Sequence, residues 1–345
     1  MQQGFSVAAQ GFLGISVMSA LASLSCSSMV GVWFWMELGV LSFFPFMTMR
    51  NGETRAESAI TYFFSQVVGS MGVLVYLMSV GLYGFSDPAS SVAVFGLGGL
   101  VVGLLVKVGV APFHGWVPLT VSGTGWQSLM MMLSVQKIVP WVVLVHLAPS
   151  WFVGVLFVAG VSAVWGGIGG SSEGDVRSIL GWSGVSQGGW CLAAGLDSDK
   201  AVGVFYVVVY LFHVFISSLL MSRAFSGSVM GDLGMSSLAS GSWSVRYCAV
   251  VLFLSLSGVP PMLGFFSKFL VVGSLTWGGY GFVLPALFTG AVLSSFFYLR
   301  MGMLFLSPSR WSWRRRGGFG RDFSLYSFMV MCIFGGVIVF LWALK

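Results

Sequence analysis

Charge is scarce in this sequence, because only 8% of its 345 residues are charged whereas 57% are apolar. A water-soluble fold needs more polar surface than this composition supplies, so the chain is an integral membrane protein. At about 20 residues for each crossing, the apolar runs allow roughly ten to twelve helices and leave almost nothing for a soluble domain. Any chemistry that needs a soluble domain must therefore be done by partner proteins.

Cysteine and nucleotide-binding motifs are also scarce. The four cysteines are scattered without C-x-x-C spacing, which argues against an iron–sulfur cluster, a zinc site or a disulfide framework. No convincing strand precedes a glycine-rich turn, so close helix packing explains the 48 glycines better than a P-loop or a dinucleotide fingerprint. The first ten residues, MQQGFSVAAQ, lack a basic or arginine-rich amphipathic pattern, so we expect neither a secretory nor a mitochondrial import leader.

Eleven apolar segments separated by short polar breaks predict an all-α polytopic membrane protein. They cover 5–25, 27–49, 57–84, 91–121, 124–145, 150–169, 176–196, 200–224, 246–276, 280–306 and 324–344. We interpret residues 1–148 and 149–306 as two inverted five-helix repeats. Residues 307–345 then form a basic loop and one additional C-terminal helix.

Two of these segments contain the same interruption, and this is the basis for the repeats. Residues 106–116 read VKVGVAPFHGW and residues 258–265 read GVPPMLGF, which share Gly-Val-x-Pro-x-x-Gly-aromatic 149 positions apart. Glycine and proline at these places predict helices that break within the bilayer. The two segments are the fourth and the ninth, so they cross in opposite directions. The alternative is coincidence, because both residue types are common in membrane helices.

The basic residues at helix ends, in loops and at the C-terminus are distributed unequally between the two sides. With eleven crossings, Lys200 and Lys345 fall on one side, and the side of the N-terminus receives Arg50, Arg55, Arg177, Arg223, Arg246, Arg300, Arg310, Arg314, Arg315, Arg316 and Arg321. The positive-inside rule then places the N-terminus in the cytoplasm-like compartment. We expect the basic loop at 310–321 to contact anionic lipid or a partner, not nucleic acid.

Four charged residues lie inside apolar segments, namely Glu37, Lys107, Lys137 and Lys268. Each lysine near the middle of the membrane opposes insertion by about 2.5–3.5 kcal/mol, which favours a functional reason for its presence. Two of these lysines also lie near prolines: Pro112 is expected to free the carbonyl of Val108, and Pro140 that of Gln136. Free carbonyls at this depth attract water and ammonium groups.

These four groups predict a proton path. Burial favours the neutral amine of a lysine and a nearby carboxylate favours its charged form, so a buried lysine whose partner moves is a switchable proton site. We hypothesise that Glu37 and Lys107 form such a pair, that Lys137 is an intermediate carrier and that Lys268 is the exit group. The alternative is that each lysine extends to an interface or rests in a static ion pair.

The three histidines have different environments. His114 lies in the first break, where a proton relay and a structural hydrogen bond to a freed carbonyl are equally compatible with the sequence. His213 lies in an apolar run, YLFHVF, where we favour a structural role over a relay. His146 is expected at an interface. Haem ligation is disfavoured because no segment carries two histidines.

Six stretches carry a resemblance to a known family, in the family's order. They are WFWMELGVLSFFP (33–45), ESAITYFFSQVVGS (57–70), LLVKVGVAPFHGWVP (104–118), SVQKIVP (134–140), DVRSILGWSGVSQGGW (175–190) and LSGVPPMLGFFSKF (256–269). Together they resemble the NADH dehydrogenase subunit 2 family, the mitochondrially encoded antiporter-like subunits of respiratory complex I. Residue by residue, the resemblance matches Glu37 and the three buried lysines to the key groups of that family.

The resemblance implies a proton-translocating, multi-pass subunit of the mitochondrial inner membrane, with the arginine-rich side and the N-terminus in the matrix. It implies other complex I membrane-arm subunits, including antiporter-like neighbours, as partners. It also implies that NADH, flavin (FMN), iron–sulfur clusters and ubiquinone bind in those partners and that this chain holds no cofactor. Two alternatives are a stand-alone cation/proton antiporter and a structural or assembly subunit that does not pump.

Overall fold

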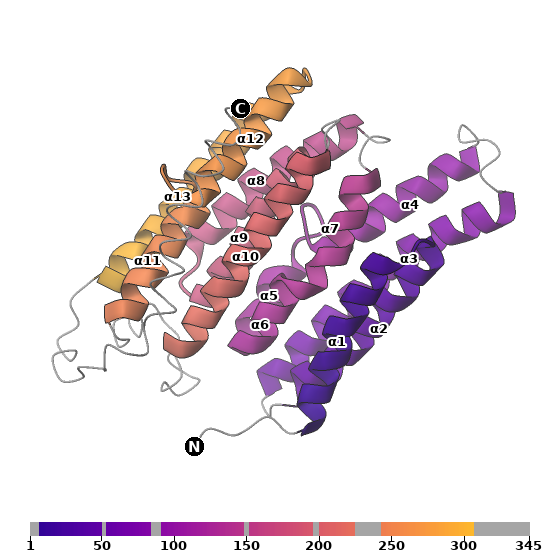
Figure 1. Ribbon diagram of the computed structural model, residues 1–345, viewed down its shortest axis with the longest axis horizontal. Helices are drawn as coiled ribbons and strands as arrows, with labels where there is room; N and C mark the ends of the chain where they lie inside the picture. Colours follow the sequence, from indigo (N-terminus) through magenta and orange to yellow (C-terminus); the bar gives the residue numbers. More distant parts are fainter. Residues whose placement is uncertain are drawn as a thin grey trace. The chain divides into compact units, whose positions relative to one another are not determined.

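The computed structural model describes residues 7–49, 53–83, 91–147, 152–195, 200–224 and 243–306, and no β-strand occurs among them (Figure 1). The chain divides into two compact units, Met1–Leu147 and Ala148–Lys345. The first unit contains α1 (Val7–Ser25), α2 (Met29–Thr48), α3 (Glu53–Tyr83), α4 (Ser91–Val108), α5 (Trp116–Gly123), α6 (Trp126–Leu133) and α7 (Val135–Leu147). The second contains α8 (Phe152–Ser172), α9 (Val176–Ala194), α10 (Lys200–Ala224), α11 (Trp243–Ser257), α12 (Leu263–Trp277), the short 3₁₀ helix η3 (Gly281–Val283) and α13 (Leu284–Leu306).

The helices are long and apolar, as the composition requires. Seven stretches of the described residues are long and apolar enough to cross a membrane, and three further apolar helices are shorter. The shorter ones include the halves of the interrupted segments. Ten of the eleven predicted segments correspond to a described helix or to a pair of consecutive helices. The last predicted segment, 324–344, and the basic loop at 310–321 lie outside the described residues.

Small residues bring the helices of each unit close together. In the first unit, a Cβ atom on Gly72 of α3 would overlap the backbone of Gly99 and Gly103 in α4. In the second, a Cβ atom on Gly189 of α9 would overlap the backbone of Ala159 and Ala163 in α8. Helices approach this closely only where a side chain is missing. The predicted role of the glycines in close packing is therefore confirmed at these positions.

Both predicted helix breaks are present. In the first unit α4 ends at Val108 and α5 begins at Trp116, and in the second α11 ends at Ser257 and α12 begins at Leu263. Each break starts with a glycine of positive φ, Gly109 at +76° and Gly258 at +83°, a conformation that other residues adopt at a cost. The inverted relation between the two repeats stays a prediction.

The predicted segment 124–145 corresponds to an apolar stretch long enough to cross a membrane, Trp126–His146, but an interruption that the sequence did not predict lies at Ser134. The helix α6 ends at Leu133 and α7 begins at Val135, with Ser134 at φ −110° and ψ −80°. The Ser134 hydroxyl donates to the carbonyl of Met130, so the side chain competes with the helical backbone for hydrogen bonds. Pro140, which we expect to free the carbonyl of Gln136, lies inside α7, and that helix continues through it.

Candidate functional site

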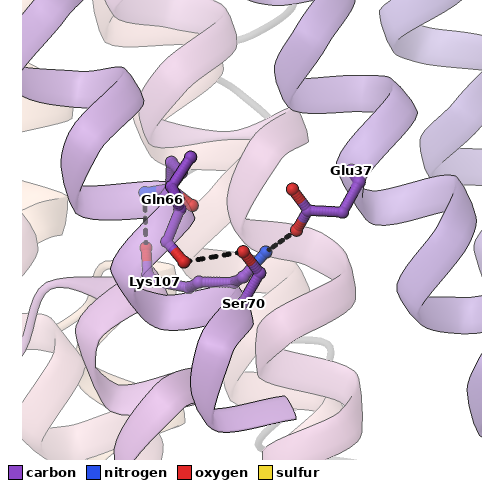
Figure 2. Close-up of polar contacts among 5 residues, drawn as sticks. Glu37, Gln66, Ser70 and Lys107 are labelled. Atoms are coloured by element: carbon purple, nitrogen blue, oxygen red, sulfur yellow. Dashed lines mark hydrogen bonds and ion pairs between the residues drawn. The ribbon is translucent and has the colours of Figure 1, made fainter. Parts of the chain in front are cut away.

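An ion pair joins α2 to α4 in the first unit. The ammonium nitrogen of Lys107, Nζ, donates to Oε1 of Glu37 at 2.7 Å. The Lys107 side chain is 1% exposed and that of Glu37 is 20% exposed. Figure 2 shows the two side chains pointing toward each other from their helices. The predicted pairing of Glu37 with Lys107 is therefore present, although 70 residues separate them.

Side chains satisfy two carbonyls that the first break leaves without helical partners. The amide of Gln66 in α3 donates to the carbonyl of Lys107 at 3.3 Å, as Figure 2 shows, and the indole of Trp116 donates to the carbonyl of Val106 at 3.0 Å. The last four carbonyls of any helix need such partners. The sequence predicts that Pro112 frees the carbonyl of Val108. The carbonyls that side chains hold are those of Val106 and Lys107, which lie earlier in the chain.

A small polar cavity lies beside this ion pair. Its volume is about 20 Å³, which is room for about one water molecule. The polar residues that line it are Ser19, Ser23, Gln66, Lys107 and Gln136. A water molecule in this cavity would have several hydrogen-bonding partners and would lie next to the buried Lys107. Nothing in the sequence points to the serines of α1 as part of this site.

Lys137 and His114 lie near interruptions of the first unit. Lys137 is buried in α7, and its backbone amide donates to the carbonyl of Ser134 at 3.1 Å, so it follows directly after the third interruption. His114 is half-buried in the segment between α4 and α5, where its carbonyl accepts from the amide of Val117 at 3.0 Å. Neither residue lines the cavity beside Lys107. Their roles in proton transfer stay predictions.

Lys268 contacts the second break. It is buried in α12, and its Nζ atom donates to the carbonyl of Ser257, the last residue of α11, at 3.0 Å. The same nitrogen lies 5.5 Å from the centre of the Trp190 ring, within the range of a cation–π interaction. A carbonyl at a helix break thus accepts from an ammonium group at Lys268, whereas the sequence predicts such carbonyls beside Lys107 and Lys137.

His213 belongs to the surroundings of Lys268. Both residues line one cavity of about 20 Å³ in the second unit. The Nε2 atom of His213 lies 2.6 Å from the hydroxyl of Ser255 in α11, and its Nδ1 atom lies 2.7 Å from the carbonyl of Val209. The sequence analysis did not place His213 near Lys268, because nothing local in YLFHVF shows which helix it contacts. The only signal available was a polar residue in an apolar segment.

The arrangement suits proton transfer. It consists of buried basic groups, a carboxylate, hydroxyls, amides and two water-sized cavities. Within the described ranges, no group of three His, Cys, Asp or Glu side chains has the arrangement of a metal site. Charged groups buried in a membrane mark ion or proton pathways more often than they contribute to stability.

Comparisons with known proteins identify the family to which the sequence is similar. Residues 26–294 match the family described as "NADH:quinone oxidoreductase/Mrp antiporter, TM". NADH-ubiquinone oxidoreductase chain 2 of Lumbricus terrestris is 29% identical over 286 residues, which cover 83% of each chain.

Two solved structures share the fold. A chain of respiratory complex I from Thermus thermophilus, solved with bound aureothin, matches with a TM-score of 0.84 at 20% identity, over 98% of this chain and 80% of that chain. A chain of the Mrp complex from Dietzia sp. DQ12-45-1b matches with a TM-score of 0.75 at 16% identity, over 86% and 61% of the two chains. Because the family match spans most of the sequence and both interrupted helix pairs, the chain belongs to the NADH:quinone oxidoreductase/Mrp antiporter transmembrane family.

Proposed function

We propose that this chain is a proton-translocating membrane-arm subunit of NADH:ubiquinone oxidoreductase, respiratory complex I. The observation that carries the proposal is the buried ion pair between Glu37 and Lys107 in a chain of this family. The curated relative from Lumbricus terrestris bears the name of a chain of that enzyme. Redox chemistry in partner subunits drives the movement of protons through the lysines of this chain.

The mechanism that we propose is electrostatic. A change in a neighbouring subunit moves charge near Glu37, whose side chain is the more exposed of the pair. When the carboxylate withdraws or gains a proton, the buried ammonium of Lys107 loses its stabilising partner and releases a proton. When the carboxylate returns, Lys107 takes up another. Lys137 carries the proton onward, Lys268 hands it over, and His114 assists at the first break.

We propose that the cofactors of the enzyme bind outside this chain. NADH, FMN, iron–sulfur clusters and ubiquinone bind to partner subunits, and this chain contributes protonatable groups alone. We place the chain in the mitochondrial inner membrane with its N-terminus in the matrix, because the arginine-rich side of the segment model would face that compartment. Its partners are other membrane-arm subunits, including antiporter-like neighbours, and membrane lipid. No nucleic acid is involved.

The first test asks whether the chain is part of the enzyme. Native membranes are solubilised gently, complexes are separated on a native gel, and the chain is detected together with NADH-oxidising activity. We expect the two to migrate together. A chain that migrates alone, without this activity, would refute the subunit assignment.

The second test addresses proton movement. In membrane vesicles that hold the assembled complex, we expect Lys107→Met to abolish proton pumping coupled to NADH oxidation. The control is Lys200→Met, because Lys200 stands at the start of α10 and outside both cavities. If Lys107→Met leaves pumping intact while deletion of the chain destroys the complex, the subunit is structural.

A stand-alone cation/proton antiporter is the second candidate, and the fold shared with the Mrp complex chain favours it. It predicts that the purified chain, reconstituted alone in liposomes, exchanges a cation for protons across the membrane. The subunit proposal predicts no exchange by the chain alone.

A further inference from the structure

The cavity of the second unit brings two basic side chains together from different helices. Lys268 reaches it from α12 and His213 from α10. Ser255, at the end of α11, lines the same cavity. The volume of about 20 Å³ is room for about one water molecule. This arrangement gives Lys268 a neighbour, His213, that the proton path described above does not use.

Hydrogen bonds assign the protons of the His213 ring. A carbonyl oxygen only accepts, so the Nδ1 atom, 2.7 Å from the carbonyl of Val209, carries a hydrogen. In the neutral ring the Nε2 atom is then an acceptor, and the Ser255 hydroxyl at 2.6 Å donates to it. The neutral imidazole therefore presents a base to the Ser255 hydroxyl, which lines the cavity.

Lys268 lacks the kind of partner that Lys107 has. Among the residues that the structure describes, its ammonium group pairs with no carboxylate, and its neighbours are the Ser257 carbonyl and the face of Trp190. These neutral groups stabilise a buried charge less than a carboxylate does. A proton on Lys268 therefore has a weaker hold than a proton on Lys107, and a nearby base competes for it more easily.

We propose that His213 is a proton-accepting residue of the second unit, which shares one mobile proton with Lys268 through a water molecule and the Ser255 hydroxyl. The proton leaves Nζ of Lys268 and crosses the water to Oγ of Ser255, while the hydroxyl hydrogen of Ser255 passes to Nε2 of His213. A lysine amine and an imidazolium result, and the reverse step restores the start. The total charge is unchanged, so only one buried positive charge is present at any time.

Other protonatable groups near the cavity do not take this role. The phenols of Tyr206 and Tyr210 line it, but a phenol is already neutral and holds its proton up to about pH 10 even in water. The Tyr206 hydroxyl also donates to the side-chain oxygen of Gln187. His213 and Lys268 are thus the two groups on this cavity that exchange a proton under physiological conditions.

The test separates proton transfer from a purely structural hydrogen bond. This inference rests on the proposed function, so it is tested in the assembled complex, with proton pumping and NADH:ubiquinone turnover measured per assembled enzyme. Glutamine at position 213 keeps a side chain that accepts from Ser255 but cannot take up the proton, whereas leucine keeps neither property. If His213 accepts the proton, His213→Gln and His213→Leu both reduce pumping at least about tenfold, since positioned acids and bases contribute about 10²-fold or more.

A structural role gives a different result. In that case His213→Gln pumps like the parent protein and only His213→Leu loses activity, and this outcome overturns the inference. Ser255→Ala is the second variant: it removes the hydroxyl between the cavity and Nε2, so we expect the same loss, and normal pumping overturns the inference as well. His146→Gln is the matched control, because His146 makes the same Nδ1 contact to a carbonyl four residues earlier, with Val142, but is exposed.

Lys268→Met distinguishes failure of this inference from failure of the proposed function. If Lys268→Met abolishes pumping and His213→Gln does not, only the role of His213 is wrong. If pumping survives Lys107→Met and Lys268→Met, the proposed function itself is wrong.

Discussion

Breaking the Glu37–Lys107 pair tests the physical basis of the mechanism. At 2.7 Å, two unit charges attract by about 6 kcal/mol when the effective dielectric constant is about 20. Removing both ions from water costs several kcal/mol for each, so the pair contributes little net stability. Removing only one member of the pair costs more stability, because Glu37→Gln leaves the Lys107 side chain, which is 1% exposed, without its counter-ion. We expect that single substitution to cost about 3–5 kcal/mol or to force Lys107 into its neutral form.

The double variant makes this reasoning refutable. Replacing both members, Glu37→Gln with Lys107→Met, removes the charge together with its partner, and such replacements are often neutral in stability. The assay heats solubilised membranes through a temperature series and measures on native gels how much of the chain stays in the complex. We expect Glu37→Gln to leave the complex at a lower temperature than the parent, and the double variant to recover.

Pumping in the same samples should behave differently from assembly. The single variant lacks the carboxylate, and the double variant lacks both the carboxylate and the lysine. Neither retains a lysine whose charge responds to a carboxylate, so we expect both to lose proton translocation. A Glu37→Gln variant with unchanged stability and unchanged pumping would refute the reasoning. A double variant that pumps normally would refute it independently.

Three further substitutions test how the helix breaks support the lysines, each measured by assembly and by pumping. Gly69→Ala places a Cβ atom 2.5 Å from Cγ of Lys107, and we expect this overpacking to cost about 1–3 kcal/mol and to displace the lysine. Gly258→Ala should cost about 1–2 kcal/mol, because φ is +83° and the new Cβ atom lies 3.2 Å from Nζ of Lys268. Trp116→Phe removes the donor to a carbonyl of α4, which we expect to cost about 1–3 kcal/mol.

The chain offers a matched control for each of these substitutions. Gly81 in α3 and Gly273 in α12 have no atom within 4 Å of a new Cβ, so alanine there should be neutral or stabilising by up to about 1 kcal/mol. Trp277 is 94% exposed at the end of α12, so Trp277→Phe should leave assembly and pumping unchanged. If a control variant loses as much assembly or pumping as the test variant with which it is paired, the contact proposed to cause the loss is not its cause.

The sequence by itself was sufficient for the class of protein and the approximate helix ends. Hydropathy over about 20 residues is a local property, and the cost of burying backbone groups in lipid leaves helices as the main solution. The two breaks were also predictable, because glycine and proline act on their own helix. The break at Ser134 was not, because a serine hydroxyl bonds to its own helix in many places without interrupting it, as Ser162 does in α8.

For the candidate site, the sequence likewise identified the residues, and only the structure showed their contacts. The cost of a buried charge depends on composition alone, so the sequence identified Glu37 and the three lysines as the groups that need an explanation. Their partners depend on which helix faces which, and no local pattern contains that information. Only the tertiary structure decided that Gln66 contacts the carbonyl of Lys107, and that His213 shares a cavity with Lys268, because these contacts join residues 41 and 55 positions apart through helix packing.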